Sequence, residues 1–166
     1  MEIVRLDDRT LALSQINAFA ISLLRRIPLE TDPGDDEIAN ERLFSKPVPE
    51  GQGSELNEEW KQYVEPGLRH LFQSANETVF QDLKNVKETG EVEGEESYAL
   101  HIPVEHLEQW LNTLNQARLV MAARNAFTEE ELSGFYPSII NTQREMNLFQ
   151  MHFYAGLQEA FIHELE

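Results

Sequence analysis

The sequence contains no cysteine among its 166 residues. This absence excludes disulfide bonds, thiol catalysis, and zinc or iron–sulfur sites with Cys ligands. A chain of this length buries about two-thirds of the surface that its unfolded form exposes, so it needs no covalent or metal staple. We therefore expect residues 1–166 to form a single domain.

Basic residues are scarce: 13 Lys and Arg stand against 30 Asp and Glu, which gives a formal net charge of −17. Binding to a phosphate backbone or to an anionic membrane surface needs clustered Lys and Arg. The charge therefore argues against nucleic acid and membranes as partners. It favours another protein, basic or hydrophobic, because acidic segments attract cations over long distances.

Long apolar runs and motifs of known chemistry are missing too. No apolar stretch approaches the roughly 18 residues of a membrane span, and Met1 to Arg5 do not resemble the start of a secretory signal. Dinucleotide-binding, P-loop, nucleophile-elbow and His-Glu-x-x-His motifs are absent. We expect a cytoplasmic protein without a cofactor, and we favour a role other than catalysis.

Apolar residues recur at helical spacing along most of the chain, between Pro, Gly and capping residues. The spacing predicts a first helix after the caps at Asp7, Asp8 and Thr10 that runs to about Arg26, and a short helix that reaches Leu43-Phe44. A helical segment is predicted from Leu56 to Lys87, and Pro66 divides or kinks it. Three more helices are predicted: one from Pro103 to about Ala126, a short one with the capping box Thr128 and Glu131, and a last one from Pro137 to His163 or beyond.

Strands and connections account for the rest of the chain. Residues 3–6 and 98–102 are predicted as short strands that could pair with each other. The acidic segments near 30–41 and 88–96 are predicted as loops, the second one mobile, because like charges repel and nothing apolar can be buried there. The predicted fold class is therefore mostly α: a single-domain bundle of five or six helices with at most one short two-stranded β element.

Arg118 is the most informative polar residue. At about 100° per residue it shares one arc of its helix with Leu107, Leu114 and Met121, and Asn115 flanks it. A guanidinium on a core face keeps its charge, so it needs a carboxylate or carbonyl partner. Three hypotheses stay open: a structural ion pair, a pocket in which Arg118 and Asn115 bind a carboxylate-bearing ligand or partner, and extension to solvent. The candidate partners for an ion pair are Asp7, Asp8, Asp82 and Glu145.

Trp60 and Trp110 each fall on or beside an apolar helix face. Packing in the core is the ordinary interpretation, with Trp60 on the near side of Pro66, and anchoring of a partner protein is the alternative. The last helix carries four aromatic residues, which are predicted to be mainly core and would also permit a homo-oligomer. These are Phe149, Phe153, Tyr154 and Phe161.

Glu159 and His163 are the nearest approach to a metal site. They lie four residues apart on the last helix, in line with Glu145 and His152. Seven residues of helix rise about 10.5 Å, so one ion cannot bind Glu145, His152 and Glu159 together. Two ligands make a metal site only if other helices contribute more. A solvated helix face with a Glu–His pair is the simpler interpretation.

The segment from His106 to Val120, HLEQWLNTLNQARLV, resembles a bacterial family, domain-of-unknown-function family two thousand and seventeen. The similar pattern is a Trp-Leu pair, then Leu-Asn, then Arg-Leu on one helix. Similarity extends to Arg42-Leu43-Phe44 and to Trp60 with Pro66 and Leu68. The family pattern has an acidic residue where Gln116 stands and glycine where Ala122 stands. If the acidic residue pairs with the arginine in relatives, Arg118 needs another carboxylate here.

The resemblance implies no assigned activity. Family members are often encoded beside the adaptor of the Clp protease, which by association implies a role in regulated proteolysis. Together with the charge and the missing motifs, this favours a non-catalytic protein-binding or regulatory module. The alternative is a helical-bundle binder of a metal or small ligand, or a hydrolase, that uses Glu159 and His163.

Overall fold

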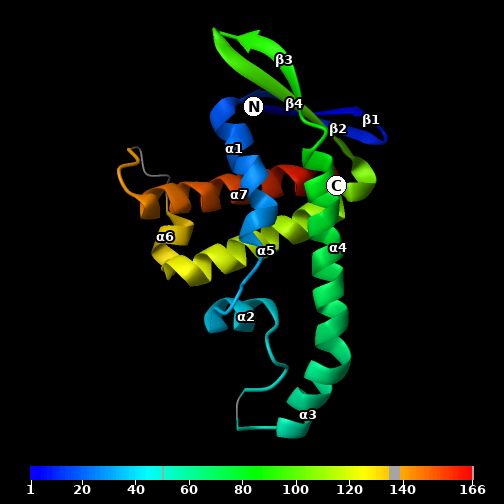
Figure 1. The fold of residues 1–166 in the computed structure, drawn as a ribbon, viewed down its shortest axis with the longest axis vertical. Helices are drawn as coiled ribbons and strands as arrows, with labels where there is room; N and C mark the ends of the chain where they lie inside the picture. Colours follow the sequence, from blue (N-terminus) through cyan, green and yellow to red (C-terminus); the bar gives the residue numbers. More distant parts are fainter. Residues whose placement is uncertain (50, 135–138, 166) are drawn as a thin grey trace.

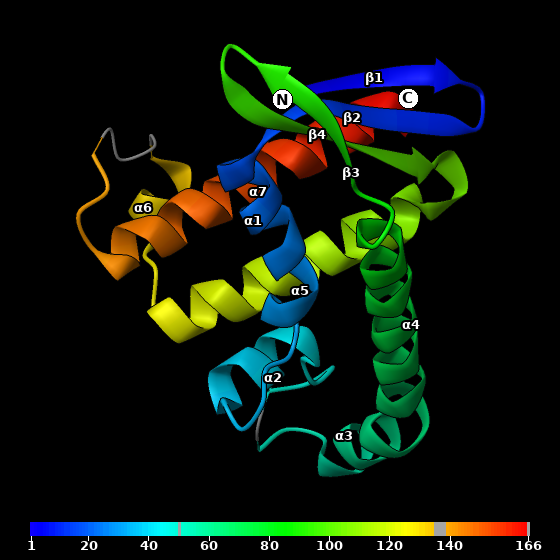
Figure 2. The ribbon, with the colours of Figure 1, turned by 45° about the horizontal axis from the view of Figure 1, so that its top comes forward.

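The computed structural model describes residues 1–49, 51–134 and 139–165. An antiparallel sheet of four strands, in the order β1-β2-β4-β3, forms one end of this part of the chain. The helices all lie on one side of that sheet (Figures 1 and 2). The strands are β1 (Glu2–Asp7), β2 (Thr10–Asn17), β3 (Lys87–Val92) and β4 (Glu95–Pro103).

The helical layer is built from segments of very different length. In chain order they are α1 (Ala18–Arg26), the 3-10 helix η1 (Ile27–Glu30), α2 (Glu37–Leu43), α3 (Ser54–Glu59), the π-helix η2 (Trp60–Val64), α4 (Glu65–Leu83), the 3-10 helix η3 (Val104–His106), α5 (Leu107–Asn125), α6 (Glu129–Ser133) and α7 (Gln143–Leu165).

The main core lies between the sheet and the helices. Leu11 and Leu13 of β2 and Leu100 and Ile102 of β4 are completely buried, because the register places these alternate residues on the same face. Side chains of α1, α4, α5 and α7 pack against them. Trp110 of α5 is also fully buried, so its prediction as a core residue is confirmed.

The helical-bundle prediction is wrong, since four strands form a sheet and the described chain is mixed α and β. The segment after Thr10 is a strand, and α1 starts only at Ala18, after the N-cap Asn17. Leu11 and Leu13 alternate inward as in any half-buried strand. A bulge at Gln15, which has a φ of 51°, then turns Ile16 back to the same face. This break in the alternation produced a spacing that resembles a helix.

The acidic segment 88–96 is a β-hairpin and not a loop. Glu93 and Gly94 form its two-residue turn with φ values of 54° and 82°, the left-handed conformation that such turns require. All six residues of β3 are exposed, so backbone pairing with β4 holds the strand without burial of its side chains. The predicted pairing of 3–6 with 98–102 is also wrong, because β2 lies between β1 and β4.

Several boundaries are confirmed. Helix α2 ends at Leu43, α5 ends at Asn125, and Thr128 and Glu131 form the predicted capping box of α6. Pro66 lies in the first turn of α4, directly after the π-helix η2, where the wider turn accommodates a residue without an N–H. The predicted start of the last helix at Pro137 lies outside the described residues, and α7 begins at Gln143.

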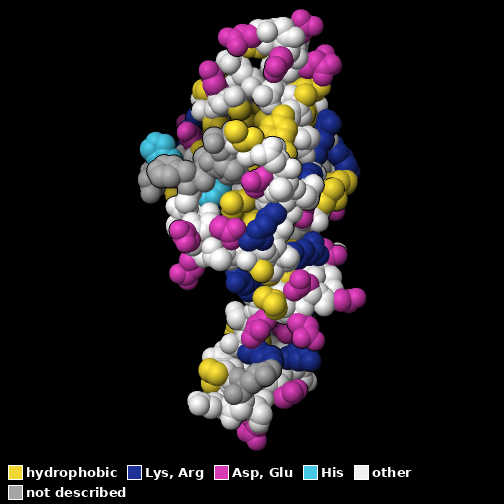
Figure 3. Space-filling model, turned by 90° about the vertical axis from the view of Figure 1, so that its left-hand side faces the viewer, with side chains coloured by type: hydrophobic (Ala, Val, Ile, Leu, Met, Phe, Trp, Pro, Cys, Tyr) yellow, Lys and Arg dark blue, Asp and Glu magenta, His cyan; other side chains and the backbone are white. Residues whose placement is uncertain are grey.

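Acidic side chains cover the end of the molecule formed by the β3–β4 hairpin (Figure 3). Five glutamates between positions 88 and 96 account for this concentration: Glu88, Glu91, Glu93, Glu95 and Glu96. In the described part of the chain, none of the helices has both the length and the apolar character needed to cross a membrane.

Candidate functional site

The outer face of the sheet is uncovered by the described helices. Val4, Ala12 and His101 occupy neighbouring positions on β1, β2 and β4, and they point away from the rows that fill the core. Val4 and His101 are exposed, whereas Ala12 between them is 5% exposed. Because the described helices lie on the opposite side of the sheet (Figure 2), this face is available to a partner.

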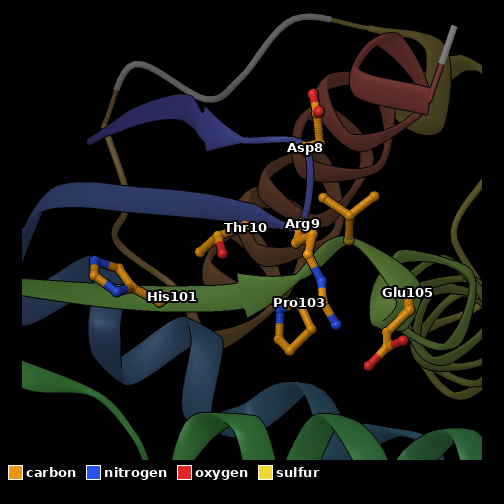
Figure 4. A pocket seen from close by; sticks show the side chains of 7 residues that line it. Asp8, Arg9, Thr10, His101, Pro103 and Glu105 are labelled. Carbon is orange, nitrogen blue, oxygen red and sulfur yellow. The ribbon is translucent and has the colours of Figure 1, made fainter.

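A groove of about 570 Å³ runs along the end of this outer face (Figure 4). The β1–β2 turn forms one side of it, and the junction of β4 with η3 forms the other. The lining residues are Asp8, Arg9, Thr10, His101, Pro103, Val104 and Glu105. The backbone N–H of Val104 donates to the carbonyl oxygen of Arg9 at 2.9 Å, which fixes the two sides relative to each other.

Charged groups surround the groove. Arg9 extends from the turn across it, while Asp8 and Glu105 lie on opposite sides (Figure 4). Among the described acids, none lies within salt-bridge distance of Arg9. The Asp7 carboxylate accepts the Arg9 backbone N–H at 2.8 Å, and this bond lowers the pKa of Asp7. The hydrogen bond from the Arg9 backbone N–H to the Asp7 carboxylate therefore holds the turn in place and leaves the Arg9 guanidinium available.

A buried carboxylate connects three elements behind the sheet. Asp82, in the last turn of α4, is 5% exposed and accepts the indole N–H of Trp110 at 2.9 Å. The Nδ1 atom of His106 lies 3.0 Å from the same carboxylate. Asp82 thereby joins α4 to η3 and α5, at the two ends of the β3–β4 hairpin. Sequence reasoning missed this cluster, although a buried indole N–H usually has an acceptor.

Arg118 has a different environment from the one predicted. Its Nη1 donates to the Oε1 of Gln158 on α7 at 2.5 Å, and Gln158 donates in turn to the carbonyl of Leu111. The guanidinium is half-buried, which lowers the pKa of Arg118, and its Nε atom has no partner among the described residues. No described carboxylate lies within salt-bridge distance, so the predicted ion pair is wrong.

The candidate carboxylates are occupied elsewhere or distant. Asp82 accepts from Trp110, and Glu145 caps the start of α7 by accepting the backbone N–H groups of Asn141 and Thr142. The side-chain amide of Gln158 therefore accepts the hydrogen bond from Arg118 that was expected to go to a carboxylate. A helix wheel locates the face of Arg118 but not the residue that lies opposite.

The other predicted binding residues are scattered. Asn115 is exposed on α5, and neither it nor Arg118 lines the groove. Trp60 is half-buried, and its shielded indole N–H has no partner in the described chain, so it packs less completely than expected of a core residue. Glu159 and His163 are both exposed. Within residues 1–49, 51–134 and 139–165, no three His, Asp or Glu side chains form a group that could hold a metal ion.

The family described as "Domain of unknown function (DUF2017)" has a model that matches residues 5–165, nearly the whole chain. Comparison with curated proteins and with solved structures gives no match.

Proposed function

The chain belongs to the DUF2017 family, and from its structure we propose that it is a non-catalytic protein-binding module. The observation that carries the proposal is the uncovered outer face of the sheet, with its groove between the β1–β2 turn and the start of η3. An antiparallel sheet is stable with one face solvated, and the same face is a ready surface for another protein.

The arrangement of polar groups supports binding over catalysis. Asp82 is fully engaged with Trp110 and His106 behind the sheet, and Arg118 is engaged with Gln158 between two helices. These groups connect elements of the fold and do not line the groove. The charged groups that remain available at a concave surface are Arg9, Asp8 and Glu105, which suit recognition of a polar partner surface.

The charge of the molecule indicates the kind of partner. A net charge of −17 repels nucleic acid and anionic membranes, and it attracts a basic protein from a distance. The acidic β3–β4 hairpin projects beside the outer face and would add to this attraction (Figure 1). We therefore take a protein with a basic surface as the partner.

The test uses a matched pair of histidine variants. His101 is exposed on the outer face, and His70 is exposed on α4, away from the sheet. His101→Lys places a cation on the proposed surface, whereas His70→Lys adds the same charge elsewhere. Tagged wild-type protein and both variants are used to capture partners from an extract of the native host, with quantitative mass spectrometry as the readout.

We expect the wild type and His70→Lys to retain the same proteins and His101→Lys to lose them. Circular dichroism melting of all three proteins verifies that they are folded. Equal retention by His101→Lys, or no protein retained above a resin control, would contradict the proposed function.

A further inference from the structure

The outer edge of β1 has no strand beside it in the described chain, and it exposes two apolar side chains between charged ones. β1 pairs only with β2, so half of its backbone N–H and C=O groups point away from the sheet. Val4 and Leu6 on this strand are 46% and 55% exposed. An unpaired edge is a template for pairing with another chain, and natural proteins limit such pairing with charges and bulges. The bulge of β1 lies at its end, between Arg5 and Asp7, so the pairing from Glu2 to Arg5 is regular.

The last turn of α7 adds apolar surface below the same edge. The guanidinium of Arg5 donates to the carbonyl oxygen of Glu164 at 2.9 Å, which places this turn against β1. Ile162 and Leu165 in the same turn are exposed. A strand added at the edge would therefore meet Val4 and Leu6 on one face and the end of α7 on the other.

The charges at the edge are mainly negative. Glu2, Asp7 and Asp8 are exposed there, and Glu164 lies in the adjoining turn of α7. Arg5 is the cation of this strand, and its guanidinium is turned onto carbonyl oxygens of the chain itself. An incoming strand with Lys or Arg would find acidic partners. A second copy of this chain would bring another net charge of −17 and would be repelled.

We propose that the β1 edge binds an extended segment of a partner protein in which apolar residues alternate with Lys or Arg. The segment adds as a fifth strand next to β1: its backbone supplies the hydrogen bonds, and its alternate side chains contact Val4 and Leu6. This inference rests on the proposed protein-binding function and specifies the mode of binding and the chemistry of the partner.

The probe is a fluorescent peptide of alternating valine and lysine, about nine residues long, which is enough to span the 6 residues of β1. Its binding to the full chain is followed by fluorescence anisotropy. Two control peptides separate the contributions to binding. One replaces lysine by glutamate, and the other keeps all side chains but is N-methylated at every residue, so that it cannot donate a backbone hydrogen bond.

The protein variants compare the two edges of one sheet. The double variant Val4→Thr with Leu6→Thr places β-branched, strand-forming side chains at both positions but removes apolar contacts at β1. Its matched control is Val92→Thr on β3, where the valine is 44% exposed. We expect the double variant to bind the peptide about tenfold more weakly and Val92→Thr to bind within about twofold of the wild type.

Both control peptides are expected to bind much more weakly than the probe. Hydrogen exchange should slow at β1 amides, and not at β3 amides, when the probe is bound. Equal loss of affinity in the β1 and β3 variants, or undiminished binding of the N-methylated peptide, would overturn the proposal. Self-association of the protein alone that the double variant abolishes would assign the edge to a second copy and would overturn it too.

The capture experiment with the host extract separates this inference from the proposed function. If His101→Lys loses the partners while the Val4→Thr, Leu6→Thr variant keeps them, the outer face binds protein and the edge inference fails. If neither variant loses them, both the function and the inference fail. Loss of the same partners in both variants, together with peptide binding that depends on β1, supports the inference.

Discussion

The two outer strands of the sheet expose a valine to nearly the same extent, 46% for Val4 on β1 and 44% for Val92 on β3, yet the strands differ in how they pair and pack. β1 carries apolar side chains on a regular pairing from Glu2 to Arg5. β3 carries Lys87, Glu88 and Glu91 and has a bulge in its middle, between Glu88 and Gly90, whereas the bulge of β1 lies at its end, between Arg5 and Asp7. Charges and bulges are features that discourage further pairing at an edge. The comparison shows that solvent exposure alone does not reveal which edge is available.

The two edges are also anchored differently. Ile3 of β1 packs against the main core, and Arg5 bonds to the end of α7. β3 contributes no side chain to the described core, and Thr89 bonds only to the neighbouring strand at Ser97. β4 is paired with β2 and contributes buried side chains to the core, and the base of the β3–β4 hairpin is fixed by Asp82, which precedes β3 and contacts residues that follow β4. β1 is thus held by its own side chains as well as by pairing with β2, whereas β3 is held by pairing with β4 and by the contacts at the base of the hairpin.

The largest effect is expected for Asp82→Ala. Removal of the carboxylate leaves the buried indole N–H of Trp110 without an acceptor and releases His106. We expect a loss of roughly 3 kcal/mol in unfolding free energy and a fall of roughly 10 °C in melting temperature. Hydrogen exchange should accelerate at β3 amides more than at β1 amides. Equal acceleration at both edges would contradict anchoring of β3 from its base.

The loss of unfolding free energy should differ between Ile3→Ala and Val92→Ala, by less than the effect of Asp82→Ala. Ile3 is partly buried against the core, so its truncation is expected to lower the unfolding free energy by about 1–2 kcal/mol. Val92 contacts solvent, so its truncation should change stability by less than about 0.5 kcal/mol. Urea denaturation of the two variants measures both values. A larger loss at Val92 would show that β3 is packed more tightly than β1.

Acid and alkali are expected to weaken opposite sides of the sheet. A backbone bond from Arg9 lowers the pKa of Asp7 at the end of β1, so its stabilisation is present above the ordinary Asp range and is lost as the pH falls below it. A hydrogen bond to Glu96 raises the pKa of Tyr98 on β4, next to β3. Its stabilisation is present below the ordinary Tyr value of about 10 and is lost as the pH rises above it.

Variants measure these two contributions. The urea midpoint of Asp7→Asn should differ from that of the wild type at neutral pH and approach it in acid. Tyr98→Phe should differ at neutral pH and approach the wild type in alkali. A difference that stays constant with pH in either variant would mean that the altered group does not contribute through its ionisation.

The smallest effect is expected at Arg118, which touches neither edge. Because no described carboxylate pairs with it, Arg118→Met strands no buried anion and removes a half-buried cation whose Nε is unpartnered. We expect the unfolding free energy to stay within about 1 kcal/mol of the wild type, with the exchange rates of β1 and β3 unchanged. A loss of several kcal/mol would reveal an anionic partner for the guanidinium.

Sequence reasoning located the helices better than the strands, for a physical reason. Helices such as α5 depend on spacing and caps that lie within one segment, and the capping box of α6 is complete within four residues. Strand pairing depends on residues far apart in the chain. Thr10–Asn17 passes directly into α1 without a turn, so its apolar residues merged with those of the helix into one pattern.

The β3–β4 hairpin shows how charge can mislead. Five glutamates suggested that the segment 88–96 could not fold, but exposed side chains do not prevent backbone pairing with a strand that is itself anchored in the core. The signal for the hairpin was the Glu93-Gly94 dipeptide, since glycine next to a polar residue suits a two-residue turn. The outer face and its groove could not be predicted, because they exist only once β2 and β4 are paired.

The strand order also governs when the sheet can assemble. Leu11 of β2 pairs with Ile102 of β4, about 90 residues later in the chain. At a synthesis rate of about 5–20 residues per second, roughly ten seconds pass before the central pair can form. During that time the N-terminal hairpin presents Leu11 and Leu13 without their cover, and such non-local pairing is slow even in the finished chain. The acids between β2 and β4 keep the growing chain negatively charged, and mutual repulsion between nascent chains then protects it from aggregation until β4 emerges.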